Sequence, residues 1–129
     1  MFERPWRHRS ILQSIIGALK GLHLVIKTER NAKIIAALGA LAIAAGFILQ
    51  ISLLEFIIVI IVITIVFAFE TFNTITEILL DLIIPDKDPH VKILKDIASG
   101  TVLIATISAV VIGVIIFLPK ILTLLGIKI

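Results

Sequence analysis

The first regular pattern along the chain is an amphipathic stretch over residues 10–27. Apolar residues recur there at helical spacing, whereas polar residues lie seven apart on the opposite side: Ile11, Ile15, Leu19, Leu22 and Ile26 against Gln13, Lys20 and Lys27. This pattern is typical of a helix in the membrane surface, with its lysines toward anionic headgroups. The alternative is a soluble amphipathic helix packed on its own protein. We expect a surface helix over about residues 10–30.

Three later stretches are apolar enough to cross a bilayer: residues 34–54, 56–84 and 97–118. At about 1.5 Å per residue, the first would form about 31 Å of helix, which matches a hydrocarbon core of about 30 Å. The second continues into a polar extension, and Pro119 marks the end of the third. The pattern predicts an all-α integral membrane protein with three transmembrane helices in one domain, residues 1–129.

Composition supports this class, because 60% of the 129 residues are hydrophobic and only 16% are charged. A chain this small buries little core alone, so we expect self-association with other copies. We expect no nucleic-acid partner. The amino-terminal arm and the 85–96 loop are rich in lysine and arginine, which predicts that both are cytoplasmic. Lys120 and Lys128 would then lie outside, against this rule.

Polar residues on the second span form one stripe in the stretch FETFNTITEILLD: Glu70, Asn73, Glu77 and Asp81. Their spacings of 3, 4 and 4 place them within a helical sector of about 80°. If the helix enters the membrane near Phe56, Glu70 lies about 21 Å along it, inside the inner leaflet. Charges at such depth are rare and usually functional. The alternative is a protonated or paired Glu70 that serves helix association.

Carboxylates at the edge of a membrane suit Mg²⁺, which prefers one or two carboxylates together with phosphate oxygens. Glu29 precedes the first span, and Lys95 and Asp96 precede the third, so all three are expected at the same face. Such a set indicates phosphoryl transfer from a nucleotide to a lipid alcohol, with Glu70 as general base. The sequence contains neither G-x-x-x-x-G-K-[ST] nor G-x-G-x-x-G, so helix faces must build the nucleotide site.

The set KTERN, E-x-x-N-T-x-x-E-x-x-x-D and K-D-I-A-S-G, with one span on either side, resembles the prokaryotic diacylglycerol kinase family. That family includes the undecaprenol kinases, and the likeness covers about residues 10–120. The resemblance implies a homotrimeric enzyme of the bacterial plasma membrane, with active sites shared between neighbouring chains. It implies ATP- and Mg²⁺-dependent phosphorylation of a membrane lipid alcohol, either undecaprenol or diacylglycerol.

Residue roles follow from motif positions in the resemblance. Glu70 resembles the catalytic base, Glu29 and Glu77 resemble metal ligands, and Asp81 matches a supporting acid. The nucleotide would be bound by Asn73, Lys95, Asp96, Glu29, Glu77, Asp86 and Asp88. Ile75 and Leu94 stand where the family usually has alanine, which leaves an inactive family member as one alternative. A non-catalytic membrane subunit, or an oligomer that binds a cation or proton, is another.

Overall fold

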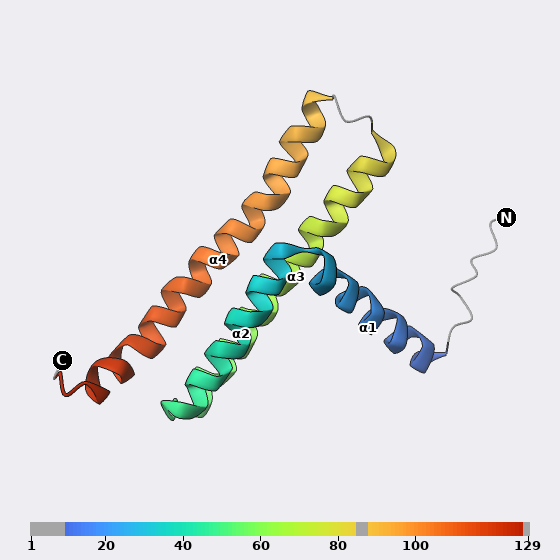
Figure 1. Ribbon diagram of the computed structural model, residues 1–129. Helices are drawn as coiled ribbons and strands as arrows, with labels where there is room; N and C mark the ends of the chain where they lie inside the picture. Colours follow the sequence, from blue (N-terminus) through green and yellow to red (C-terminus); the bar gives the residue numbers. More distant parts are fainter. Residues whose placement is uncertain (1–9, 85–87, 128–129) are drawn as a thin grey trace.

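The computed structural model describes residues 10–84 and 88–127, and in these ranges the chain forms four helices and no strand (Figure 1). The helices are α1 (Ile11–Thr28), α2 (Arg30–Ile48), α3 (Leu53–Ile83) and α4 (Pro89–Leu124). Each of the four is long and apolar enough to cross a membrane by length and composition. The expected all-α membrane class is therefore confirmed. The placement of α1 in the membrane surface stays a prediction.

The central element is α3, which contacts α1, α2 and α4. Both α2 and α4 run antiparallel to α3, and α1 leaves the bundle at an oblique angle where α2 begins (Figure 1). With 31 residues α3 is about 46 Å long, whereas the 19 residues of α2 extend about 28 Å. The carboxyl end of α3 and the amino end of α4 therefore project together beyond the start of α2, as Figure 1 shows.

The helix boundaries correct three sequence expectations. First, α2 ends at Ile48 rather than near residue 54, because Gln50 takes a positive φ of 50° and Ser52 caps the next helix. Second, α4 begins at Pro89, inside the expected 85–96 loop, because the Asp88 side chain caps it and proline suits a first helical turn. Third, α4 continues through Pro119 to Leu124 instead of ending there.

Two glycines set the close approach of α2 to α3. A Cβ added at Gly39 would lie 2.9 Å from Ile63 Cγ2, and one at Gly46 would lie 3.1 Å from the ring of Phe56. Both glycines are buried. Small residues permit such close packing between membrane helices.

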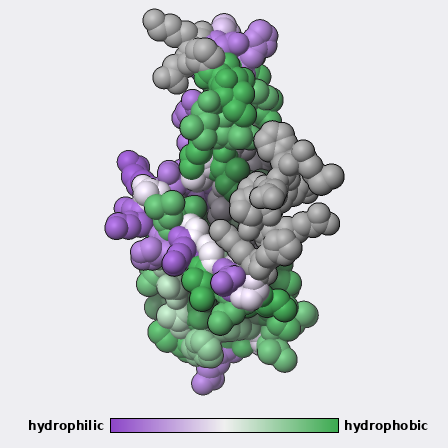
Figure 2. Space-filling view, turned by 90° about the vertical axis from the view of Figure 1, so that its right-hand side faces the viewer, coloured by the Kyte–Doolittle hydropathy of each residue, from purple (hydrophilic) through white to green (hydrophobic). Residues whose placement is uncertain are grey.

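Most large apolar side chains of the described residues are exposed in the single chain. Figure 2 shows hydrophilic residues gathered at the level where α1 joins α2, with hydrophobic residues below and above that level. The lower apolar surface is suited to lipid. The upper one includes the carboxyl end of α3, where Ile78, Leu79, Leu82 and Ile83 are all more than half exposed.

Candidate active site

The site begins with the buried face of α3. The buried residues of this helix are Val59, Val66, Glu70, Asn73 and Thr74. Val59, Val66 and Asn73 lie seven apart, so one helical face is apolar deep in the bundle and becomes polar toward the projecting end. Glu70 is 2% exposed and Asn73 is 8% exposed. The polar stripe predicted from spacing therefore faces the protein at Glu70 and Asn73.

The side chains of this stripe are partly paired. Asn73 Nδ2 donates a hydrogen bond of 3.1 Å to Glu77 Oε1, and Thr74 Oγ1 donates one of 3.1 Å to the Glu70 carbonyl oxygen. In the part of the chain that the structure describes, Glu70 Oε2 and Asn73 Oδ1 are buried acceptors without a hydrogen-bond partner. An unpaired buried acceptor is costly, so each such oxygen indicates a place for a donor or a cation.

Glu29 brings a second carboxylate toward this face. It is the one residue between α1 and α2, with extended φ of −89° and ψ of 123°, and its side chain makes no capping hydrogen bond to α2. The Glu29 and Glu77 carboxylates both interact electrostatically with Glu70, and the Asn31 side chain faces Glu70 as a hydrogen-bond donor. The structure thus gathers Glu29, Glu70, Asn73 and Glu77.

A groove of about 310 Å³ opens over Glu70 and Asn73. Its remaining lining comes from α2 and α4: Asn31, Ile34, Ile35, Ser99, Val102, Leu103 and Thr106. The buried acceptors of α3 therefore face a space large enough for part of a ligand. Asn31 and Ser99 are polar groups of this groove that the sequence prediction missed, although Asn31 lies within KTERN and Ser99 within the K-D-I-A-S-G motif.

The predicted nucleotide residues at the projecting end form separate contacts. Lys95 Nζ pairs with Asp81 Oδ1 at 2.5 Å, which joins α4 to α3 above the groove. Asp96 is exposed one residue further along α4. Asp88 is occupied as the cap of α4, where its Oδ1 accepts from the His90 backbone N–H at 2.8 Å. Asp86 lies outside the described residues.

No three acidic, histidine or cysteine side chains come close enough to hold an ion together within residues 10–84 and 88–127. Magnesium does not need such a cage, because it is usually bound by one or two carboxylates, substrate phosphates and water. The Glu29 and Glu77 carboxylates, each of which acts electrostatically on Glu70, are of the type this requirement calls for.

Comparisons with known proteins identify the family of the chain. The family model for prokaryotic diacylglycerol kinase matches residues 17–117. The chain is 34% identical to the undecaprenol kinase of Bacillus subtilis over 108 residues, which cover 84% of this chain and 88% of that protein. It is 31% identical to the diacylglycerol kinase of Synechocystis over 117 residues, which cover 90% of this chain and 67% of that protein. No solved structure matches the chain. The chain therefore belongs to the prokaryotic diacylglycerol kinase family of bacterial membrane lipid kinases, as its motifs predicted.

Proposed function

We propose that this protein transfers the γ-phosphoryl group of ATP to the hydroxyl of a membrane lipid alcohol at the cytoplasmic edge of the membrane. Family membership supports the reaction class. The observation that carries the proposal is the buried Glu70 side chain, which lines the groove and whose Oε2 has no hydrogen-bond partner among the described residues. A lipid hydroxyl in that groove supplies the donor.

In this proposal, residues of α2, α3 and α4 have separate roles in proton transfer, orientation and charge neutralisation. Glu70 accepts the hydroxyl proton as the oxygen attacks the γ-phosphorus, and ADP leaves with the electron pair of the broken P–O bond. Asn73 holds the Glu77 carboxylate through its 3.1 Å hydrogen bond, so that carboxylate keeps one orientation. Asn31 orients Glu70 from the α2 side. Lys95 supplies positive charge near the phosphates from its place beside Asp81.

Magnesium would be held by Glu29 and Glu77. When bound, it neutralises the charge of the ATP phosphates and of the developing transition state. Without a cation, the Glu29 and Glu77 carboxylates repel that of Glu70, so this arrangement of like charges is itself a reason to expect a cation there. Asp81 holds Lys95 in place at the projecting end, and Asp96 lies exposed beside Lys95 in the chain, where it can take part in nucleotide binding.

The homotrimer belongs to the same proposal. In a single chain, Ile78, Leu79, Leu82 and Ile83 at the projecting end of α3 are all more than half exposed. Contiguous apolar surface of this kind marks an interaction site. Copies of the same chain would cover it and complete each site with groups from a neighbour.

The direct test uses purified protein in detergent micelles with labelled ATP, Mg²⁺ and either undecaprenol or diacylglycerol. Labelled phospholipid from at least one alcohol is expected, and chelation of Mg²⁺ should abolish it. If a stable oligomer makes product from neither lipid, the kinase proposal fails and the non-catalytic membrane subunit remains.

A further inference from the structure

Thr106 differs from the other hydroxyl residues of α4. Each of the others donates a hydrogen bond to a carbonyl oxygen of its own helix: Ser99, Thr101, Ser108 and Thr123. Thr106 Oγ1 makes no hydrogen bond to any group within residues 10–84 and 88–127. Hydroxyls in membrane helices usually bond to a carbonyl one turn earlier, because lipid offers them no other partner. The Thr106 hydroxyl is therefore available to a group outside its own helix.

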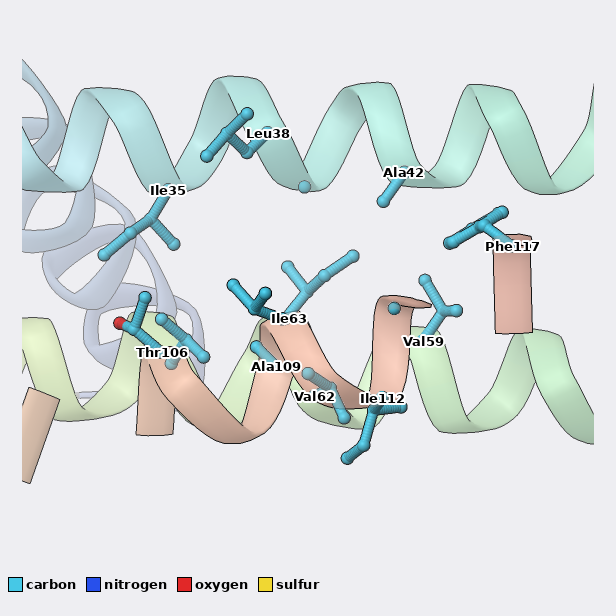
Figure 3. Close-up of a pocket in the computed structure, with 14 residues that line it drawn as sticks. Ile35, Leu38, Ala42, Val59, Val62, Ile63, Thr106, Ala109, Ile112 and Phe117 are labelled. Atoms are coloured by element: carbon cyan, nitrogen blue, oxygen red, sulfur yellow. The ribbon is translucent and has the colours of Figure 1, made fainter. Parts of the chain in front are cut away.

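Thr106 lies where two grooves meet. It lines the groove over Glu70 and Asn73, and it also lines a deeper groove of about 210 Å³ between α2 and α4. Among the described residues that line the deeper groove, Thr106 alone has a polar side-chain atom. Figure 3 shows it at the end of that groove near Ile35, with its hydroxyl oxygen on the side away from Phe117. The hydroxyl thus lies where an apolar lining gives way to the polar groups around Glu70.

The ion pair at the projecting end places Thr106 level with Glu70. Asp81 of α3 contacts Lys95 of α4, and the two helices are antiparallel. Glu70 precedes Asp81 by 11 residues on α3, and Thr106 follows the paired lysine by 11 residues on α4, about 16 Å in the same direction. Eleven residues complete three helical turns to within about 20°, so Glu70 and Thr106 each share a helical face with the ion-paired residue of their helix. The ion pair between α3 and α4 at the opposite end of the bundle gives the same level to within one residue.

Glu70 and Thr106 therefore face one groove from two helices, and their hydrogen-bonding groups are complementary to an alcohol. Glu70 Oε2 is a buried acceptor without a hydrogen-bond partner among the described residues, whereas Thr106 Oγ1 has a proton to donate. An alcohol oxygen can donate its single proton and accept a hydrogen bond at the same time. A hydroxyl bound between these two side chains would satisfy both of them.

We propose that Thr106 binds the oxygen of the lipid alcohol by donating a hydrogen bond to it, while the alcohol donates its own proton to Glu70 Oε2. This rests on the proposed kinase function and adds a substrate-binding residue to it. In the reaction the alcohol proton passes to Glu70, an electron pair of the oxygen forms the bond to the γ-phosphorus, and ADP takes the electron pair of the broken P–O bond. Thr106 keeps its proton throughout. Its hydrogen bond fixes the position of the attacking oxygen and strengthens as negative charge develops there.

The test compares Thr106→Val, which removes the hydroxyl and keeps the shape, with Thr106→Ser, which keeps the hydroxyl. Thr101→Val is the matched control, because the Thr101 hydroxyl donates to the Ala98 carbonyl oxygen at 2.6 Å and Thr101 lines neither groove that Thr106 lines. The full-length protein in detergent micelles receives ATP, Mg²⁺ and whichever of undecaprenol and diacylglycerol the parent protein phosphorylates. Thr106→Val should lower kcat/KM for the lipid about tenfold. The other two variants should stay within about twofold of the parent protein, and KM for ATP should not change in any variant.

Other outcomes separate the two proposals. Unchanged kcat/KM in Thr106→Val, or an equal loss in Thr106→Ser, overturns the assignment of Thr106 while the kinase function stands. A loss of the same size in Thr101→Val shows a general effect of α4 packing and also overturns it. If the parent protein phosphorylates neither lipid, the kinase function fails and the role of Thr106 fails with it. Should Thr106→Val not fold, Thr106→Ala is compared with Thr106→Ser under the same expectations.

Discussion

The sharpest consequence of the site geometry concerns Glu70→Gln. The substitution keeps the shape of a side chain that is 2% exposed but removes its ability to accept a proton. Glu77 is already held by a hydrogen bond from Asn73. A general base contributes about 10²–10⁴ in rate, which equals about 3–5 kcal/mol of activation free energy. Because the proposal assigns the neighbouring Glu29 and Glu77 carboxylates to the metal, we expect a loss near the upper end of this range.

The thermal stability of Glu70→Gln should not fall along with its rate. The neutral amide no longer repels the carboxylates of Glu29 and Glu77, so thermal unfolding in detergent should occur at an equal or higher temperature. The rate is measured as transfer of labelled phosphate from ATP to lipid. Glu55→Gln is the matched control, because Glu55 lies at the opposite end of α3 in the Ser52 cap and glutamine preserves its acceptor oxygen. A Glu70→Gln rate within about threefold of the parent protein would refute the assignment of the base.

Three further predictions concern packing and ion pairs. Asp81→Asn should lower the free energy of unfolding by at most about 1 kcal/mol, because its ion pair with Lys95 is partly exposed, and a larger loss in thermal unfolding contradicts this. Gly39→Val should lower the free energy of unfolding by about 1–3 kcal/mol, because the new side chain collides with Ile63. Adding Ile63→Ala to the same chain should restore part of this free energy. If the losses of the two substitutions simply add, the collision is not the cause. Ser52→Ala should cost about 1 kcal/mol by removing the cap of α3, measured by denaturant titration, and an unchanged midpoint would show that the cap is unimportant.

The polar stripe of α3 could be predicted from sequence because a helix fixes the angle between residues at known spacing. Glu70 and Asn73 share a buried face, as their spacing of three residues predicts. The position of Glu29 before the first span predicts only that it lies at the same face as the α3 carboxylates. Its approach to Glu70 depends on how α2 packs against α3, which spacing along the chain does not give. The contribution of Asn31 was missed for the same reason: a polar residue at a helix start carries no periodic signal of its own.

Helix ends were less predictable than helix faces. Between Ile48 and Leu54 only Gln50 and Ser52 interrupt the apolar run, so the sequence predicts a short connection near Gln50 but does not fix Ile48 as the last residue of α2. Pro119 was expected to end the third span, yet α4 continues beyond it and Lys120 reaches Glu55 Oε2 at 3.4 Å. That ion pair joins the two helices at the end of the bundle opposite the site. Which glycines of α2 pack closely against α3 likewise depends on the side chains that α3 presents, and these cannot be read from the sequence of α2 alone.

Glu29 is the single extended residue between α1 and α2, so its side-chain position depends on how α1 is oriented. α1 is an arm of 18 residues, about 27 Å long, and any change in its tilt must be absorbed by the φ and ψ angles of Glu29. The side chain of that residue turns with its backbone. A change in the tilt of α1 would therefore reorient the Glu29 carboxylate, which acts electrostatically on Glu70.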